Sequence, residues 1–305
     1  MDQRRKTLFY TEVLFAVMVW GASFIATKVA LRDVSPVTVV WLRFAMGVAI
    51  LGTTVMARKE SSLPSRREMG YFALLGFIGI TFHQWLQSNG LVTAQAGTSA
   101  WIIATTPIFI ALLARLFLGE RLHWQRACGI FVAAIGVLLV VSKGDFKALT
   151  AGRFVTEGDI LILISAPNWA LFSTLSRRGL QAQPAARMMF FVMAAGWLFT
   201  SVLFFAGPGL SEIFRLTGAG WLGITFLGVF GSGLAYIVWY DVLQHLPVVQ
   251  VGAFLYLEPP VAVIVAAAML GEAVTMASLL GGGLILWGVY QVNRPARQTQ
   301  VGGLR

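Results

Sequence analysis

Residues 254–272 read FLYLEPPVAVIVAAAMLGE, and this stretch decides the class of the protein. About 20 apolar residues are enough for a helix to cross the hydrocarbon core of a bilayer. A carboxylate such as Glu258 costs about 3 kcal/mol or more at that depth, and Pro259 and Pro260 each remove a helical hydrogen bond. We therefore expect a membrane-spanning segment whose interruption faces protein or a water-accessible cavity, because lipid cannot satisfy the freed polar groups.

The composition of the whole chain agrees with a membrane protein. Hydrophobic residues make up 57% of the 305 residues and charged residues 12%, which is about half the usual charged share of a soluble domain. The net charge of +10 does not indicate a nucleic-acid partner, because the basic residues lie in short loops between apolar runs. The single cysteine, Cys128, excludes an intramolecular disulfide and a cysteine-based metal site.

Measured against the span length of a bilayer, the sequence predicts an all-α integral membrane protein with ten transmembrane helices. The first apolar run, 8–31, is too long for a signal peptide and is expected to be a retained helix. The expected spans are 9–31, 36–57, 70–92, 97–118, 124–142, 157–177, 185–206, 218–242, 248–270 and 276–293. The side with both termini carries sixteen lysines and arginines and the other side five, which predicts that both termini are cytoplasmic.

The two halves of the sequence are related. A shift of 152 residues places Pro107 on Pro259, and Leu-Gly-Glu at 118–120 on the same tripeptide at 270–272. Each unit holds five spans, and an odd number reverses the second copy in the membrane. We therefore expect two inverted five-helix repeats, an architecture of secondary transporters with a site near the membrane midplane. The expected organisation is a repeat at 8–142, an extracytoplasmic linker at 143–156, a repeat at 157–293 and a cytoplasmic tail at 294–305.

Several motifs carry a resemblance to a known family. Trp20-Gly21-Ala22-Ser23, Arg43 and TTPIFIALLARLFLGERL at 105–122 resemble one half of an EamA-type protein, and Asn168-Trp169-Ala170 with LEPPVAVIVAAAMLGE repeats the pattern. The chain resembles the drug/metabolite transporter superfamily, and HQWLQSNGLVTAQAGTSAWIIATTP at 83–107 resembles the branch of the bacterial aromatic amino acid exporter YddG. This resemblance implies export across the bacterial inner membrane through a central cavity lined mainly by spans 3, 4, 8 and 9.

Polar and aromatic side chains at helical spacing suggest the lining of such a cavity. Aromatic rings with a few polar groups suit flat, apolar or cationic ligands, and the branch resemblance favours aromatic amino acids. Trp101 could instead belong to an interfacial belt, and His83 could be a packing residue and not a proton relay. The candidate substrate-binding residues are His83, Gln87, Trp101, Thr105, Trp169, Ser232, Tyr236, Trp239 and Phe254.

Charged residues and prolines within spans have two interpretations each. Glu258 is either a proton-coupling site or a structural carboxylate held by backbone donors near the proline break. Pro107, Pro259 and Pro260 are either hinges or the source of a static bend. The lone arginine in span 2, Arg43, is expected to be structural, through snorkelling or pairing inside the bundle.

The sequence also excludes some functions. It contains no Walker A loop, HExxH, CxxC or nucleophile elbow, so we expect no catalytic residues, no metal and no cofactor. The favoured function is a secondary transporter that exports aromatic amino acids by alternating access, with a small-molecule substrate and the bilayer as partners, no nucleic acid, and a monomeric state. Export of other metabolites or cationic drugs, a passive channel, and an intramembrane enzyme acting on lipid remain as alternatives.

Overall fold

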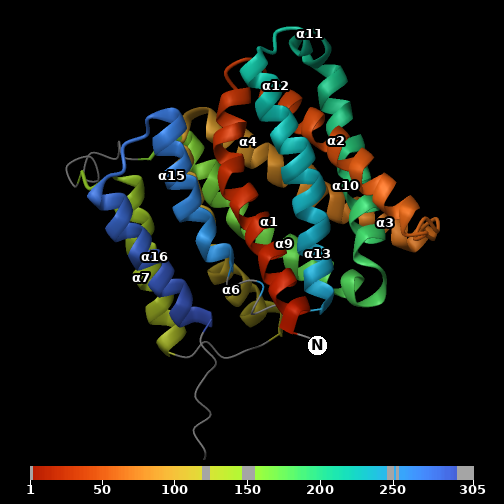
Figure 1. Ribbon diagram of the computed structural model, residues 1–305. Helices are drawn as coiled ribbons and strands as arrows, with labels where there is room; N and C mark the ends of the chain where they lie inside the picture. Colours follow the sequence, from red (N-terminus) through yellow and green to blue (C-terminus); the bar gives the residue numbers. More distant parts are fainter. Residues whose placement is uncertain (1–2, 119–123, 146–154, 246–250, 252–253, 294–305) are drawn as a thin grey trace, which may run out of the picture.

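The computed structural model describes residues 3–118, 124–145, 155–245, 251 and 254–293. The described residues form helices and no strand, which confirms the all-α class (Figure 1). Most of the expected linker and the whole expected tail, 294–305, lie outside the described residues, as do Glu120 and His123.

The helices follow one another with short connections. The first half contains α1 (Gln3–Ala30), α2 (Pro36–Ala57), α3 (Arg66–Gly76), the π-helix η1 (Phe77–Phe82), α4 (His83–Thr93), α5 (Ala96–Ile103), α6 (Thr106–Leu118) and α7 (Trp124–Val141). The second half contains α9 (Glu157–Ala182), α10 (Ala185–Ala206), α11 (Gly209–Ile213), α12 (Gly218–Thr225), the π-helix η2 (Phe226–Leu234), α13 (Ala235–His245), the 3-10 turn η3 (Phe254–Leu257), α15 (Glu258–Leu270) and α16 (Met276–Asn293).

Among the described residues, six helical segments are long and apolar enough to cross a membrane. The segment 66–93 is one of them, because α3, η1 and α4 form a continuous helix. Four shorter apolar segments coincide with the other expected spans to within one residue at their starts or lie inside them: Ala96–Ile110, Ala127–Val141, Phe254–Leu270 and Met276–Val292. The protein is therefore a multi-pass membrane protein by the length and composition of its helices.

The internal repeat of the sequence is also a repeat of helix bounds. α15 begins and ends 152 residues after α6, and α16 does the same with respect to α7. α13 likewise begins and ends 152 residues after α4. α10 begins and ends 149 residues after α2, so the two are equally long. The similarity between the halves thus extends from a few identical residues to the positions where helices start and stop.

The equivalent helices α7 and α16 pack directly against each other through glycines. A Cβ added to Gly288 would lie 2.4 Å from the Gly129 carbonyl oxygen, and one added to Gly136 would lie 2.6 Å from that of Gly281. The earlier glycine of α7 meets the later glycine of α16, so the two helices run antiparallel, side by side in Figure 1. Glycine allows the close approach of backbones that drives helix association in lipid.

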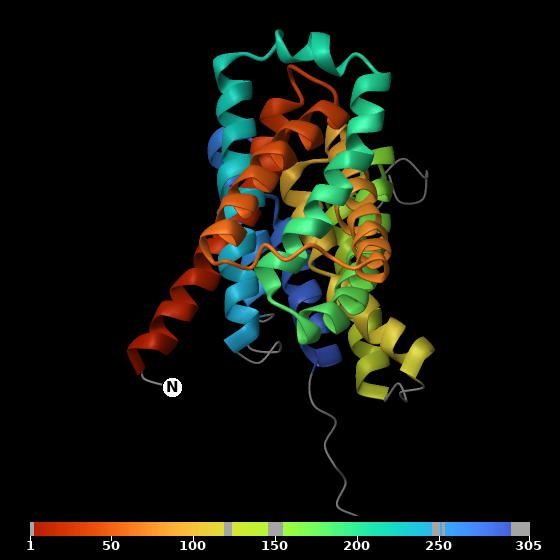
Figure 2. The ribbon, with the colours of Figure 1, turned by 90° about the vertical axis from the view of Figure 1, so that its right-hand side faces the viewer.

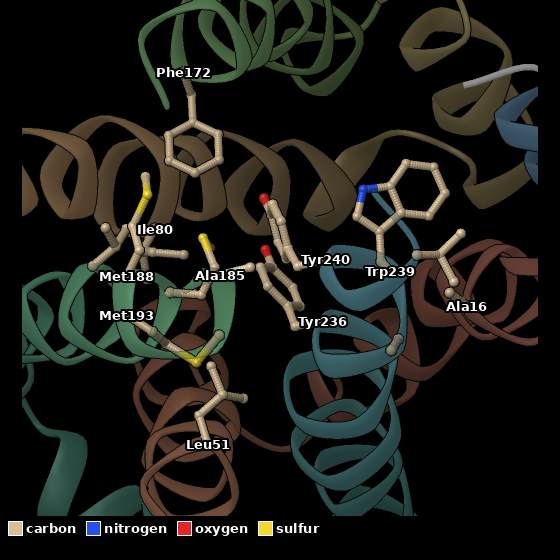
Figure 3. Packing of buried hydrophobic residues seen from close by; sticks show 14 of the residues in the cluster. Ala16, Leu51, Ile80, Phe172, Ala185, Met188, Met193, Tyr236, Trp239 and Tyr240 are labelled. Atoms are coloured by element: carbon tan, nitrogen blue, oxygen red, sulfur yellow. The ribbon is translucent and has the colours of Figure 1, made fainter. Parts of the chain in front are cut away.

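The remaining contacts between the halves are reciprocal. α1 packs against α13 and α15 of the second half, and α9 packs against α4 and α6 of the first. A large apolar cluster lies where helices of both halves meet, and Figure 3 shows part of it. Its members include Phe44 of α2, Phe72 of α3, Phe172 of α9 and Met188 of α10, all 1% exposed or less.

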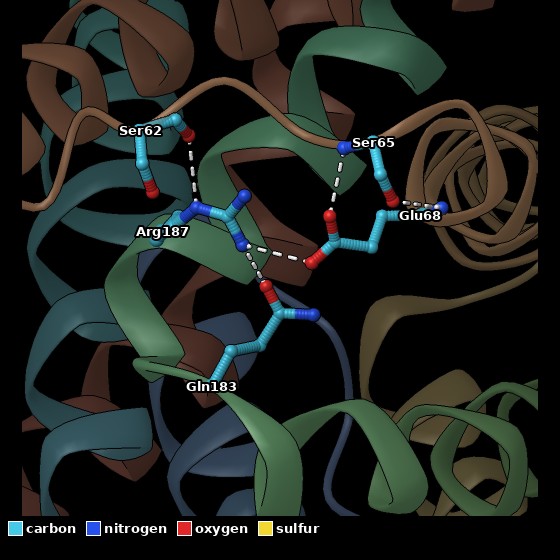
Figure 4. Close-up of polar contacts among 5 residues, drawn as sticks. All are labelled: Ser62, Ser65, Glu68, Gln183 and Arg187. Atoms are coloured by element: carbon cyan, nitrogen blue, oxygen red, sulfur yellow. Dashed lines mark hydrogen bonds and ion pairs between the residues drawn. The ribbon is translucent and has the colours of Figure 1, made fainter.

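Hydrogen bonds and an ion pair between side chains and loops join the two halves at both ends of the bundle. At the end where α11 bridges α10 and α12 (Figure 2), Glu212 accepts hydrogen bonds from the backbone N–H and hydroxyl of Ser35 and from the Thr38 hydroxyl. At the opposite end, the buried Arg187 donates to Glu68 Oε1, to the Ser62 carbonyl and to Gln183 (Figure 4). These contacts tie loops of one half to helices of the other.

The three candidate hinge prolines lie at helix starts, whereas Pro167 lies inside the continuous helix α9. Pro259 and Pro260 occupy the first turn of α15, and Pro107 is the second residue of α6. The first turn tolerates proline because its N–H groups have no intrahelical partner. The α-helix is nevertheless interrupted before these prolines. Residues 104–105 form a turn before Pro107, and the 3-10 turn η3 precedes Pro259 and Pro260. The hinge role of these prolines stays a prediction.

Candidate functional site

The most unusual polar group inside the bundle is the Arg43 guanidinium. Arg43 lies in α2 and is 5% exposed. Its Nε donates to the Ser232 hydroxyl at 3.0 Å, and its Nη1 donates to Gln84 Oε1 at 3.1 Å. The guanidinium carbon lies 5.1 Å from the centroid of the Phe44 ring. Within the described part of the chain no carboxylate forms an ion pair with Arg43, so a buried cation has only neutral partners.

The two hydrogen-bond acceptors of Arg43 lie in or near the π-helical segments. Ser232 is part of η2, and Gln84 is the second residue of α4, two residues after the end of η1. Each π-helical region also accepts a side-chain hydrogen bond from the other half. Trp20 Nε1 donates to the Gly231 carbonyl at 3.1 Å, and Asn168 Nδ2 donates to the Ile78 carbonyl at 2.9 Å. π-Helical turns free backbone carbonyls and occur frequently at functional sites.

His83 precedes Gln84, the residue that accepts a hydrogen bond from Arg43, and it lies within electrostatic range of the guanidinium. The imidazole is 4% exposed and interacts with the Ser165 backbone. Its Nδ1 is buried and has no partner at full hydrogen-bonding geometry among the described residues. The Trp169 ring lies 4.8 Å from the imidazole, centroid to centroid, and 4.9 Å from the Phe172 ring. A buried polar atom without a partner costs about 1–3 kcal/mol, so it marks a position where a ligand group could bind.

A group of aromatic side chains from α1 and α13 lies together and includes Tyr236, which interacts electrostatically with Arg43. The Trp20 ring packs edge-on against Tyr236 at 5.7 Å and lies 5.0 Å from Trp239. Tyr236 and Tyr240 are 5.9 Å apart, and Figure 3 shows their hydroxyls pointing away from α13 in the same direction. A cation, a histidine and these rings thus form a mixed polar and aromatic group inside the bundle.

The structure brings five of the nine candidate substrate residues to this group: His83, Trp169, Ser232, Tyr236 and Trp239. Three others lie elsewhere or are only half-buried. Gln87 is half-buried one turn beyond His83, Thr105 bonds the Ile102 carbonyl in the break before α6, and Phe254 stacks on Tyr10 at 5.8 Å.

Trp101 lies in a different apolar cluster. Its Nε1 donates to the Ser278 hydroxyl at 3.2 Å, and its ring covers Gly282, where a Cβ would come within 2.4 Å of the ring. The cluster around it contains Ile285 and Val289 of α16. The indole is thus in contact with α16, and its substrate role stays a prediction.

Sequence analysis overlooked three members of the group. Arg43 was expected to be structural, Gln84 is the glutamine that contacts it in place of Gln87, and Trp20 entered only as part of a family motif. The signal for Arg43 was present, because an ionisable residue in an apolar span suggests a functional site. The choice between Gln84 and Gln87 depends on how the helix is rotated, which the spacing alone does not give.

The remaining acids of interest lie at helix termini. The Glu258 side chain is half-buried at the start of α15, and no hydrogen bond or ion pair to it is found in the described segments. Glu272 accepts from the backbone N–H groups of Ala96 and Gly97, at 2.8 and 3.1 Å. Glu272 thus caps the N-terminus of α5 in the other half.

The described residues contain no group of three or more histidine, cysteine or acidic side chains that could hold a metal ion.

The comparisons with known proteins identify the family. A model of the EamA-like transporter family matches residues 8–142 and again residues 156–294. The chain belongs to the EamA-like transporter family. Members transport small solutes across membranes, and the curated relatives described below carry transporter names.

Three relatives illustrate this. An uncharacterized transporter of Archaeoglobus fulgidus is 26% identical over 282 residues, which cover 92% of this chain and 96% of the relative. A probable terminal-alkyne amino-acid exporter of Streptantibioticus cattleyicolor is 29% identical, with 92% of each chain covered. A probable amino-acid metabolite efflux pump of Salmonella typhimurium is 26% identical, over 93% of this chain and 96% of the relative.

A solved crystal structure has the same fold. It superposes with a TM-score of 0.65 over 94% of this chain and 96% of its own, at 20% sequence identity. At that identity the likeness concerns the fold alone.

Proposed function

We propose that this EamA-family protein exports amino acids and related metabolites, aromatic amino acids above all, across the bacterial inner membrane by alternating access. The observation that carries the proposal is the buried group around Arg43, in which a cation, His83 and the rings of Trp20 and Trp169 lie together. Such a group offers stacking surfaces and polar contacts to a small ligand with a ring and charged ends. The names of two relatives, an amino-acid exporter and an amino-acid metabolite efflux pump, point the same way.

The proposed architecture is ten transmembrane helices in two inverted repeats. It is supported by the matching bounds of equivalent helices and by the antiparallel packing of α7 on α16. The reciprocal contacts of α1 and α9 with the opposite halves fit the same pseudo-two-fold relation. With both termini in the cytoplasm, as the lysine and arginine counts predict, the α11 end faces the periplasm.

In this mechanism the substrate binds between the two halves of the protein. The cytoplasmic end and the periplasmic end of the bundle then open alternately. At the α11 end, Glu272 of the second half caps α5 of the first half, so contacts between the halves close this side. The breaks before α6 and α15 offer the places where these helices could tilt, with Pro107 and Pro259 at their starts. Substrate release then requires these contacts to separate.

The primary test is uptake of labelled phenylalanine into liposomes that contain the purified protein, with and without a pH gradient. We expect saturable uptake. Its absence from a correctly folded preparation would contradict the proposed substrate, and linear, non-saturable flux would indicate a passive channel. Preferential transport of cationic drugs would contradict the proposal in favour of the main alternative.

Replacing Trp169 by alanine is expected to reduce phenylalanine transport at least about tenfold, because loss of an aromatic stacking surface removes about 1.5 kcal/mol or more of ligand binding. The measurement is the concentration dependence of uptake. Trp124→Ala is the matched control, since that indole is 80% exposed at the start of α7. Equal losses in both variants would show that the effect of Trp169 is not specific to the site.

Replacing Glu258 by glutamine tests proton coupling. If this half-buried carboxylate carries the coupled proton, the variant should transport phenylalanine at a rate that no longer depends on pH. The measurement is initial uptake at several pH values, with Glu157→Gln, on an exposed residue of α9, as control. A pH dependence that survives unchanged in the Glu258 variant would assign the acid a structural role.

A further inference from the structure

We propose that Arg43 is the receptor for the substrate's carboxylate, and that the protein therefore selects ligands that carry an anionic group. The inference rests on the proposed export function and adds the chemical feature by which the site recognises its substrate. It concerns a residue whose sequence pattern alone suggested only a structural role.

The first argument is the charge of the group. A buried ion is costly unless another charge compensates it, and within membranes such ions normally pair or line a cavity. Arg43 is 5% exposed, and its side-chain hydrogen bonds go to a hydroxyl and to an amide oxygen. The buried Arg187 provides a contrast, because it pairs with Glu68. Among the described residues the positive charge of Arg43 thus lacks the anion that a structural arginine usually has.

The second argument is the geometry of the guanidinium. Arginine binds carboxylates through two parallel N–H donors, and such bidentate pairs are stronger than hydrogen bonds to neutral groups. Nε and Nη1 are held by Ser232 and Gln84, whose side chains come from different halves of the protein. A ligand carboxylate could bind Nη2 together with either Nε or Nη1, the two parallel donor pairs of a guanidinium, and would displace one of these two neutral acceptors. The displaced group could then turn toward the ligand, because a hydroxyl and an amide each have a donor to offer.

The third argument is the unpaired histidine nitrogen. His83 is 4% exposed, its Nδ1 has no partner at full hydrogen-bonding geometry within the described segments, and it lies within electrostatic range of Arg43. Buried polar atoms are almost always hydrogen-bonded, so an exception requires an explanation. We infer that a polar atom of a ligand bound to Arg43 pairs with this nitrogen and that the ligand's ring contacts Trp169, whose ring lies 4.8 Å from the imidazole, centroid to centroid.

The site thus discriminates by charge. A cationic amine or drug would meet an uncompensated arginine at close range, and like charges repel strongly in a low-dielectric interior. An amino acid brings a carboxylate that neutralises this charge. The expected order of binding is phenylalanine and 3-phenylpropionate, which both have a carboxylate, well ahead of phenylalaninamide, which has a ring and an amine but no carboxylate.

The experiment measures competition of these three compounds against labelled phenylalanine uptake, together with their effect on the melting temperature of the purified protein. We expect phenylalanine and 3-phenylpropionate to compete and to raise the melting temperature. Phenylalaninamide should be at least about tenfold weaker, the equivalent of one hydrogen bond to a charged group. Equal competition by phenylalaninamide would overturn the inference and leave the proposed export function intact.

Variants of the arginine distinguish a receptor from a structural residue. Arg43→Gln removes the charge and should abolish the preference for a carboxylate, with an unchanged or higher melting temperature in the absence of ligand, because an uncompensated buried charge is lost. Arg43→Lys keeps the charge without the planar fork and should retain the preference with about tenfold weaker binding. The matched control is Arg187→Gln, which should lower the melting temperature and keep the preference.

The outcomes for the two proposals are separable. A carboxylate preference that persists in Arg43→Gln would overturn the receptor role. Two results together would also overturn it. The Arg43→Gln variant would have to fail to fold, and the Arg43→Lys variant would have to show no preference for a carboxylate. If phenylalanine is not transported but 3-phenylpropionate and other aromatic carboxylates still stabilise the wild type and not Arg43→Gln, the receptor role is supported and the proposed amino-acid export is wrong.

Discussion

The substitution Gly288→Val in α16 should destabilise the folded protein by about 3 kcal/mol or more, because it overpacks a contact with α7 that has no room for a side chain. A Cβ at Gly288 would lie 2.4 Å from the Gly129 carbonyl oxygen and 2.8 Å from the Ala133 backbone nitrogen. Backbone atoms cannot rotate away as a side chain can. The valine would therefore force α16 away from α7, which is one of the places where the two halves pack together.

The measurement is thermal unfolding in detergent, followed by the loss of the monodisperse species. Gly283→Val is the matched control, because it lies on the same helix and no atom lies within 4 Å of its added Cβ. The control carries the same change in helix propensity and hydrophobicity. Similar melting temperatures for the two variants would refute the close packing of α7 on α16.

Replacing Glu212 by alanine should lower stability by about 1–3 kcal/mol, since three donors would lose their charged acceptor. The carboxylate is 7% exposed and holds the Ser35 backbone N–H, the Ser35 hydroxyl and the Thr38 hydroxyl at 3.0, 2.7 and 2.6 Å. These groups form the N-terminus of α2, where a negative charge also interacts favourably with the helix dipole. Glu212→Gln keeps an acceptor oxygen and should cost less.

The same contact predicts a pH dependence of stability. Burial alone would raise the pKa of Glu212, but the hydrogen bonds from Thr38 and Ser35 outweigh it and hold the pKa below its ordinary value of 4.5. A pKa that is lower in the folded state means that the stabilisation is fully present above the ordinary pKa. It is then lost as the pH falls through the folded pKa.

The wild type should therefore lose more stability than Glu212→Gln between neutral pH and the acid range below pH 4.5. Melting temperatures at several pH values measure this difference. Glu157→Gln, on an exposed acid at the start of α9, is the control and should follow the wild type. Parallel acid sensitivity in wild type and Glu212→Gln would refute the role of this carboxylate.

The sequence by itself determined the all-α membrane class and the EamA family. Continuous apolar runs, few charges and a repeated motif are local signals, since a helix in lipid satisfies its backbone within its own segment. Pro107 and Pro259 indicated an interruption within the expected spans 97–118 and 248–270, because proline restricts the backbone wherever it occurs. The structure shows that new helices, α6 and α15, begin at these positions. The LGE tripeptide and its offset of 152 residues likewise anticipated the matching helix bounds.

Tertiary structure alone decided which polar side chains meet. Arg43 contacts Gln84 from 41 residues away and Ser232 from 189 residues away, and Trp101 packs on α16 at Ser278. Helical spacing gives the face of a helix on which a residue lies, but the neighbour of that face depends on how the helices rotate and cross. In lipid that choice is made by close backbone contacts and interhelical hydrogen bonds between residues distant in the chain, which no local pattern encodes.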